Sequence, residues 1–354
     1  MASEYMQWAK LQSTARFNLA TSGVGPFPLS GLPLRMEDLD INGPNSYGYE
    51  PLLRALALKH KVEPEWVVSA AGTSMANYLA MAALVQPGDD VLIEDPAYEL
   101  LVSAASNLGA NVRRFERSFE AGFALDPRAV EKALTPRTRL IVVTNLHNPS
   151  SVYTPPEVLQ QVGALARGVG ALVLVDEVYL GAMYEDAPAS AIHLGAEFVV
   201  TSSLTKVYGV SGLRCGWILA RPELAHRMWR LNDLMGSVAA YMAEHVSYAA
   251  MQHLNVLRDR ARGVLERDRE ALRAFLARCP ELRAAPAPWG TTCFPALLSG
   301  DAAALERRLR EQYETSVVPG RFFDRPQHFR IGMGVDHERF VAGLARVERA
   351  LRAG

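Results

Sequence analysis

Apolar runs and helical patterns alternate along the first two thirds of the chain. The runs Leu140–Val143, Leu172–Val175 and Phe198–Val200 are continuous, rich in valine and free of polar alternation. Such runs are typical of strands covered on both faces, as in a parallel sheet. Segments with helical spacing, such as Thr73–Val85 and Pro155–Arg167, lie before and between these runs. The pattern predicts an α/β fold, with a mostly parallel sheet covered by helices.

Shorter elements precede these runs. The spacing predicts helices over Pro51–His60 and Tyr98–Leu108, and strands over Trp66–Ala71 and Val91–Ile93. The turn signal Pro87-Gly88 closes the helix predicted to begin at Thr73.

The pattern changes after Ala220, where long helical stretches dominate Glu223–Arg278 and shorter strand and helix signals follow. We therefore predict a large domain over residues 38–255 and a smaller α+β domain over residues 256–354. The N-terminal segment, residues 1–37, is rich in glycine and proline between Gly23 and Pro33. We expect it to join the small domain.

Composition narrows the class of protein. The chain has 354 residues, 49% of them hydrophobic, and a formal net charge of −1 with scattered Lys and Arg. A nucleic-acid or acidic-membrane partner needs a concentrated positive field, so neither is expected. There is no signal-like start and no apolar run of the roughly 18 residues that a membrane span needs. Three distant cysteines suggest neither a disulfide framework nor a metal site. We expect a soluble cytoplasmic protein.

Five short segments at predicted strand ends carry candidate chemistry. Ala71-Gly72-Thr73-Ser74 is a turn of small residues before a helix, where exposed N–H groups can bind phosphate. The same pattern also suits an ordinary strand-to-helix turn. Tyr98 follows the next strand, where its ring can stack on a flat cofactor or simply pack.

The other three segments follow the valine-rich runs. Asn145–Ser150 can offer amide donors or form an Asx-Pro turn. Asp176 ends an apolar strand, so its carboxylate needs a cationic partner. Lys206 follows Phe198–Val200 among small and apolar neighbours, where a desolvated amine can form a Schiff base. Arg214, eight residues on, can return a guanidinium to pair with phosphate.

In this order, the segments resemble the class I/II aminotransferases. These are the aspartate-aminotransferase-like members of the fold-type-I enzymes that use pyridoxal 5'-phosphate. The resemblance runs from about Asn18 to Glu348. Its most specific parts are His147-Asn148-Pro149, Asp176-Glu177-x-Tyr179, Ser203-x-x-Lys206 and Arg214.

The resemblance implies a role for each matching residue. Lys206 would hold the cofactor as an internal aldimine and move protons, and Asp176 would keep the pyridinium nitrogen protonated. Other residues would contact the ring, phosphate or substrate. Tyr179 and Asn148 would bond the phenolate oxygen, Tyr98 would stack on the ring, and Gly72, Thr73, Ser74, Ser203 and Arg214 would hold the phosphate. Arg330 would grip the substrate α-carboxylate, and the backbone near Gly23 would approach the substrate.

The chain departs from the family pattern in three places. Ser150-Ser151 follow Asn148-Pro149, where the family often has Thr-Gly, and Thr205 precedes the lysine, where Ser is common. Tyr47 directly abuts Gly48, although the family commonly has several residues between such a tyrosine and a glycine. Tyr47 remains the candidate for a phosphate contact made across a subunit interface, so we expect a homodimer.

The resemblance implies an enzyme that transfers an amino group between an amino acid and a 2-oxo acid. Relatives with the same site also perform β-elimination, decarboxylation or ring closure, so a lyase is the first alternative. A non-catalytic, cofactor-binding regulator is a further alternative, against which the complete lysine–aspartate–arginine set argues. A dinucleotide oxidoreductase is disfavoured because Gly23-x-Gly25 lacks the third glycine. The sequence does not name the substrate.

Overall fold

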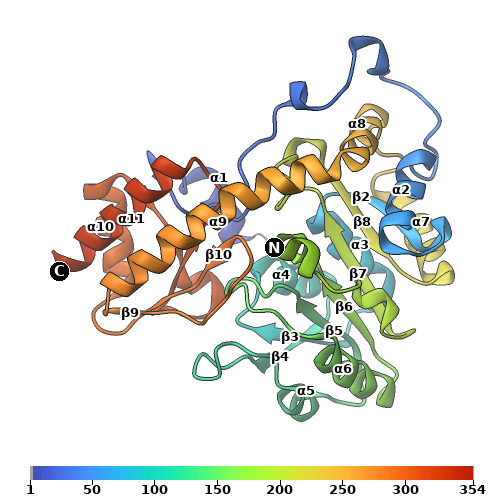
Figure 1. Ribbon diagram of the computed structural model, residues 1–354. Coiled ribbons are helices and arrows are strands. Elements are labelled where there is room, and N and C mark those ends of the chain that lie inside the picture. The colour runs from blue at the N-terminus through green and yellow to red at the C-terminus, as the bar shows by residue number, and fades with distance from the viewer. Residues whose placement is uncertain (1–2, 354) are drawn as a thin grey trace.

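A seven-stranded sheet forms the centre of the computed structural model, which describes residues 3–353 (Figure 1). The strand order is β2-β8-β7-β6-β5-β3-β4. Strands β4, β3, β5, β6 and β7 run parallel, whereas β8 is antiparallel to both β7 and β2. The prediction of a mostly parallel sheet is confirmed. The strands are β2 (Val67–Ala71), β3 (Asp90–Asp95), β4 (Asn111–Glu116), β5 (Thr138–Thr144), β6 (Leu172–Asp176), β7 (Phe198–Ser203) and β8 (Cys215–Leu219).

Two hydrophobic cores, one on each face of the sheet, explain why the central strands lack polar alternation. Successive side chains of a strand point to opposite faces. In β5, Ile141 and Val143 enter one core, while Leu140 and Val142 enter the other. All four are at most 1% exposed, so each of these positions must be apolar.

Helices cover both faces. Side chains from α3 (Thr73–Leu84), α4 (Glu99–Asn107) and α7 (Pro222–Met235) pack in one core. The other core receives α2 (Glu50–His60), α5 (Pro127–Ala133), α6 (Pro156–Gly168) and α8 (Tyr241–Gln252).

The rest of the chain forms a second, smaller group of elements at the end of a long helix (Figure 1). This helix, α9, spans Leu254–Arg278, and β1 pairs in parallel with β12, which brings the N-terminal segment to this group. We propose the domain division at 255/256, which falls in the first turn of α9. The remaining elements are α1 (Glu4–Leu11), β1 (Phe17–Asn18), β9 (Leu282–Arg283), β10 (Thr292–Cys293), β11 (Ala296–Leu297), α10 (Ala302–Tyr313), β12 (Thr315–Ser316), β13 (Val318–Pro319), β14 (Phe329–Gly332) and α11 (His337–Arg352).

Some element boundaries differ from those the sequence predicts. Trp66 ends a 3-10 turn rather than beginning β2, and Tyr98 is the extended N-cap of α4 rather than its first residue. The helical stretch Glu223–Arg278 is three helices, with breaks after Met235 and near His253. Each break lies where the chain turns to follow a different part of the core, which helical spacing does not reveal.

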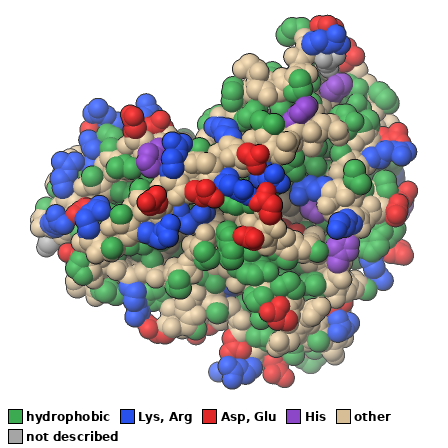
Figure 2. Space-filling model, viewed as in Figure 1, with side chains coloured by type: hydrophobic (Ala, Val, Ile, Leu, Met, Phe, Trp, Pro, Cys, Tyr) green, Lys and Arg blue, Asp and Glu red, His purple; other side chains and the backbone are tan. Residues whose placement is uncertain are grey.

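Charged side chains are distributed over the molecule. On the face shown in Figure 2, acidic and basic side chains are interspersed, matching the scattered charges of the sequence. Within residues 3–353, no helix is long and apolar enough to cross a membrane.

Candidate active site

Most of the candidate residues line a cavity of about 360 Å³ at one edge of the sheet, whereas Gly23, Gly72, Ser203 and Arg330 are not among its lining residues. Strands β5, β6 and β7 are parallel, so their last residues, Thr144, Asp176 and Ser203, lie at the same edge. The cavity wall includes eight residues singled out from the sequence: Thr73, Ser74, Tyr98, Asn148, Asp176, Tyr179, Lys206 and Arg214. This edge is where open α/β sheets bind ligands.

Lys206 presents a buried amine to this cavity. Its Nζ donates to the Ser22 hydroxyl at 2.9 Å. Burial lowers the pKa of Lys206 to about 8, aided by the positive charges of Arg330 and Arg214. The amine is thus neutral far more often near neutral pH than an exposed lysine, as a nucleophile must be.

The N-terminal segment at Gly23 lies directly against the backbone of Lys206. The amide of Val24 donates to the Lys206 carbonyl at 2.7 Å. A Cβ at Gly23 would lie 2.7 Å from the same oxygen, so only glycine fits without a shift. The sequence-predicted approach of Gly23 is therefore to Lys206, whereas its contact with a substrate remains a prediction.

Asp176 is a buried carboxylate held by neutral donors. Its two oxygens accept from the Asn77 amide at 2.8 Å and from the Val178 N–H at 3.0 Å. Burial raises the pKa of Asp176 to about 6, against the opposing effect of these hydrogen bonds. Among the described residues, no cationic side chain forms an ion pair with it. A buried carboxylate of this kind is stabilised by a bound cation or a protonated ring nitrogen.

The start of α3 lies beside the Arg214 guanidinium. Gly72 precedes the helix with φ +81°, and Thr73 and Ser74 begin its first turn, whose N–H groups point out of the helix end. The Thr73 hydroxyl donates to that of Ser203 at 2.8 Å. Nη2 of Arg214 donates to the Ala71 carbonyl at 3.1 Å. A helix N-terminus beside a guanidinium suits a phosphate group.

Arg330 lies on β14 and is fully buried; it does not line the cavity itself but contacts Asn148 and Tyr5, which do. Its Nη1 donates to Oδ1 of Asn148 at 2.9 Å, and its Nη2 donates to the Tyr5 hydroxyl at 3.1 Å. Its Nε is buried and has no hydrogen-bond partner within residues 3–353. A buried guanidinium with an unused donor indicates a missing acceptor, which a ligand carboxylate supplies.

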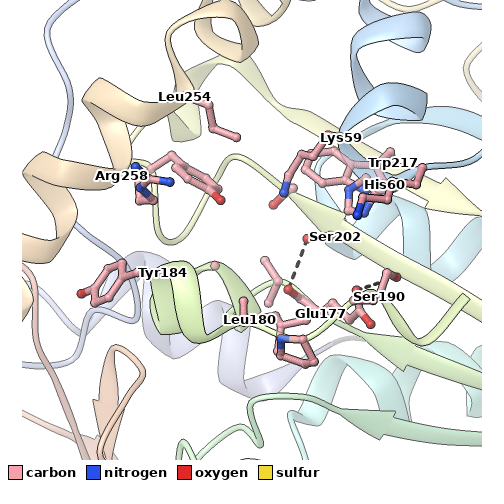
Figure 3. Close-up of a pocket in the computed structure, with 18 of the residues that line it drawn as sticks. Lys59, His60, Glu177, Leu180, Tyr184, Ser190, Ser202, Trp217, Leu254 and Arg258 are labelled. Carbon is pink, nitrogen blue, oxygen red and sulfur yellow. Dashed lines mark hydrogen bonds between the residues drawn. The ribbon is translucent and has the colours of Figure 1, made fainter. Parts of the chain in front are cut away.

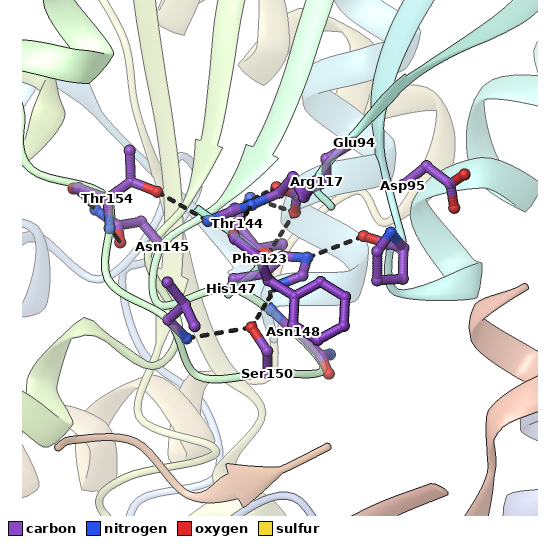
Figure 4. Close-up of polar contacts among 12 residues, drawn as sticks. Glu94, Asp95, Arg117, Phe123, Thr144, Asn145, His147, Asn148, Ser150 and Thr154 are labelled. Atoms are coloured by element: carbon purple, nitrogen blue, oxygen red, sulfur yellow. Dashed lines mark hydrogen bonds and ion pairs between the residues drawn. The ribbon is translucent and has the colours of Figure 1, made fainter. Parts of the chain in front are cut away.

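A buried polar network holds the Asn148 turn (Figure 4). The Asn148 N–H donates to the Thr144 hydroxyl at 2.9 Å, and that hydroxyl donates to Glu94 at 2.5 Å. Glu94 also pairs with Arg117 at 2.7 Å, and neither side chain is exposed. His147 extends the network, with its Nε2 2.9 Å from the Pro96 carbonyl oxygen. These hydrogen bonds therefore fix the turn that places Asn148 against Arg330.

Three tyrosines, Tyr5, Tyr98 and Tyr179, line the same cavity. Burial raises the pKa of Tyr179 to about 12, so its hydroxyl stays protonated and can donate a hydrogen bond. Tyr98 packs edge-on against Tyr5, with ring centroids 5.6 Å apart, and its hydroxyl lies 3.8 Å from the Met6 sulfur. Its stacking on a cofactor ring remains a prediction.

Tyr47 is not brought to this cavity. It is 44% exposed, accepts a hydrogen bond from Arg230 at 2.6 Å and packs edge-on against Trp229. Its contact with a neighbouring subunit remains a prediction.

Sequence reasoning missed two contributors to the site, Tyr5 and Asn77, and it expected the segment from Ser22 to act through its backbone, whereas the Ser22 hydroxyl accepts from Lys206. Asn77 had a usable signal, because it lies four residues after Thr73 and thus on the same helix face. Tyr5 had none, since its partner Arg330 is 325 residues away.

A second, larger cavity of about 560 Å³ (Figure 3) shares Val178 with the first. Glu177 faces it, because consecutive residues at the end of β6 point to opposite sides. Glu177 accepts hydrogen bonds from Ser190 and from the Ala191 N–H, and burial raises its pKa to about 7. Lys59 and Arg258 reach this cavity from α2 and α9. It contains neither Lys206 nor Asp176, so the smaller cavity is the candidate active site.

The residues of the smaller cavity fit pyridoxal 5'-phosphate. They provide an amine of lowered pKa, a buried carboxylate without a cationic partner and a helix N-terminus beside an arginine. These match an aldehyde, a protonated ring nitrogen and a phosphate, respectively. Glycine at position 72 lets the Arg214 guanidinium approach this helix end, since a Cβ there would lie 2.2 Å from Nη2.

Known proteins resemble this chain over most of its length. The family model "Aminotransferase class I and II" matches residues 40–347. Capreomycidine synthase of Streptomyces vinaceus is 31% identical over 314 residues, which are 88% of this chain and 80% of that protein. Aspartate aminotransferase of Streptomyces avermitilis is 26% identical, covering 86% of this chain and 80% of that protein.

A solved structure agrees in fold. A pyridoxal-phosphate-dependent aminotransferase from Streptococcus suis superimposes with a TM-score of 0.93 at 24% identity, covering 100% of this chain and 98% of the other.

Proposed function

Because this chain belongs to the class I and II aminotransferase family, we propose that the cavity around Lys206 is its active site. The protein is a pyridoxal-phosphate-dependent aminotransferase, and its substrates are an amino acid and a 2-oxo acid. One observation carries the assignment of the site. The Lys206 amine of lowered pKa and the buried Asp176 carboxylate line the same cavity.

Each residue has a task in the reaction. When bound, the cofactor supplies an aldehyde for the substrate amine and a ring that withdraws electrons from the substrate Cα. Lys206 would hold that aldehyde carbon covalently and, once released, carry the proton to and from Cα. Asp176 would keep the ring nitrogen protonated, and Tyr179 and Asn148 would donate to the ring oxygen.

The remaining residues hold charged groups in place. Gly72, Thr73, Ser74, Ser203 and Arg214 would bind the phosphate, and Arg330 the substrate α-carboxylate. The unused Nε of Arg330 and the helix start beside Arg214 support these roles. A cytoplasmic location remains a prediction.

The proposed site is tested by borohydride reduction of the purified protein followed by mass spectrometry of its peptides. We expect a pyridoxyl adduct on Lys206 and its loss in Lys206→Ala. A screen of amino acids, with detection of the 2-oxo acid formed, then identifies the substrate. An adduct on another lysine, retained in Lys206→Ala, would contradict the assignment.

A second candidate is another reaction of an amino acid at the same site, such as ring closure or elimination. The similarity to capreomycidine synthase favours it, since that name describes synthesis rather than amino transfer. Lys206 and Asp176 serve either reaction, so product analysis distinguishes them. Transamination leaves a 2-oxo acid and the pyridoxamine form of the cofactor, whereas the alternatives return the aldehyde form.

We also propose a homodimer in which Tyr47 reaches the partner's phosphate site. Tyr47 is half exposed and outside the cavity of its own chain, and apolar side chains are exposed nearby on α7 and the loop after it, namely Leu234, Met235 and Val238. Mixing tests this arrangement. Inactive Lys206→Ala and Tyr47→Ala chains should regain activity after subunit exchange, because one site of each heterodimer then carries neither change. No recovery despite demonstrated exchange would place Tyr47 elsewhere.

A further inference from the structure

We propose that Tyr5, on the N-terminal helix α1, is a substrate-binding residue that contacts the α-carboxylate together with Arg330. The helix α1 then forms one wall of the active site, and the bound carboxylate adds a contact that holds α1 in place. This inference rests on the proposed function, because it takes Arg330 as the carboxylate-binding arginine.

The Tyr5 hydroxyl has one partner and an unused hydrogen. It accepts from Nη2 of Arg330 at 3.1 Å, and no acceptor for its own hydrogen occurs among the described residues. Tyr5 lines the cavity that contains Lys206 and Asp176. Its hydroxyl is therefore placed to donate to a ligand there.

Arg330 has an unused donor on the edge that faces Tyr5. Nε and Nη2 form one edge of the planar guanidinium, and Nη2 is the atom bonded to Tyr5. Nε is buried without a partner within residues 3–353. A carboxylate oxygen that satisfies Nε comes next to the Tyr5 hydroxyl, so one anion can use both free donors. Asn148 occupies Nη1 at 2.9 Å and keeps the guanidinium from turning away.

The helix α1 owes its position to aromatic packing around Tyr5. The Tyr5 ring lies edge-on against Tyr98 and Phe322, with centroids 5.6 and 5.5 Å apart. Trp8, one turn later, packs on the same Phe322 at 5.5 Å. At its start, Ser3 caps α1 through the Met6 N–H at 3.0 Å. A helix of eight residues is not stable alone in water, so these contacts and the Arg330 bond hold it.

The packing joins two separate parts of the chain across the cavity. Tyr98 precedes α4 beside the large sheet, whereas Phe322 belongs to the turn Gly320–Phe323, which precedes β14. A carboxylate bound between Tyr5 and Arg330 adds an acceptor for both. The bound carboxylate therefore holds α1 more firmly against the rest of the protein.

The decisive variant is Tyr5→Phe, which removes the hydroxyl and keeps the ring packing. We expect the KM for the amino acid to rise about tenfold, the effect of one hydrogen bond to a charged group, with kcat nearly unchanged. The inhibition constant of propionate, an unreactive carboxylate, should rise by a similar factor. Cofactor affinity should stay near that of the parent, whereas thermal stability should fall modestly because Nη2 of Arg330 loses its acceptor. Gln7→Ala, on the exposed face of α1, is the matched control and should change none of these quantities.

Hydrogen exchange of the parent protein gives a second measurement that needs no variant. Propionate should slow exchange of the α1 amides in the cofactor-loaded protein, and the slowing should vanish in Tyr5→Phe. Absence of any slowing in the parent overturns the proposed coupling of α1 to the ligand.

Arg330→Lys separates failure of this inference from failure of the proposed site. If Tyr5→Phe leaves both constants unchanged while Arg330→Lys raises them, Tyr5 only packs and the proposed function stands. If Arg330→Lys also leaves them unchanged, the carboxylate lies elsewhere and the proposed role of Arg330 is wrong.

Discussion

Replacing Gly72 with alanine should weaken cofactor binding through a single steric contact. Gly72 has φ +81°, and a Cβ there would lie 2.2 Å from Nη2 of Arg214, so the guanidinium must move. The unfavourable backbone conformation, φ +81° and ψ 170°, costs about 1–3 kcal/mol, but it acts on the protein with and without cofactor alike. The contact between arginine and phosphate is worth about 1.5–3 kcal/mol. Only this second term changes cofactor affinity, which we expect to fall about ten- to hundredfold.

The assay is a titration of the apoprotein with pyridoxal phosphate, followed by the absorbance of the bound cofactor. Gly88→Ala is the matched control, since Gly88 has φ +90° and no described atom lies within 4 Å of a Cβ built there. It should lower thermal stability through its own positive φ and leave cofactor affinity unchanged. If Gly72→Ala binds the cofactor as tightly as the parent, Arg214 does not hold the phosphate and the reasoning is refuted.

Three further predictions concern titrating groups of the two cavities. Asp176→Asn should lower kcat by about a hundredfold or more while the cofactor stays bound, because a neutral amide cannot stabilise the protonated ring nitrogen; near-parental turnover would contradict this role. Since the pKa of Lys206 is lowered to about 8, the rate at which the apoprotein bonds pyridoxal phosphate should rise with pH and level off above about 8. A rate that keeps rising towards the ordinary lysine pKa of 10.5 would show that Lys206 is not desolvated. Burial raises the pKa of Glu177 from 4.5 to about 7, so the folded apoprotein favours the protonated acid. Its contribution to stability is fully present below the unfolded pKa and is lost as pH rises through about 7. Between about pH 5 and pH 8, the free energy of unfolding measured in urea should fall by on the order of 3 kcal/mol more in the parent than in Glu177→Gln. An equal fall in both proteins would refute the shift.

The sheet was predictable because its signal is local. Leu140–Val143 must be apolar at every position, since alternate residues of β5 enter different cores. Parallel strands end at the same edge, so Asp176 and the segment carrying Lys206 were expected there, while the tertiary structure made β6 and β7 neighbours. The family resemblance rests on the same strand ends, and it correctly implied the fold, the cofactor and the enzyme class.

The limits of the helices were less predictable because packing decides them. Helical spacing runs through Glu223–Arg278, yet the chain breaks there twice to cover different parts of the core. Tyr98 was predicted to begin a helix, but its backbone is extended, with ψ 119°. Such departures depend on neighbours distant in sequence.

The sequence by itself determined the parallel sheet, the order of the segments at its edge and the chemical types collected there. These features follow from short-range patterns, because a few consecutive residues indicate both a strand buried on two faces and the position at which it ends. Only the tertiary structure decided that Tyr5 meets Arg330 and that Asn77 holds Asp176. The first of these contacts depends on the N-terminal segment pairing at Phe17 with Thr315 of β12. No periodicity links positions so far apart, since their approach is set by how the whole core packs.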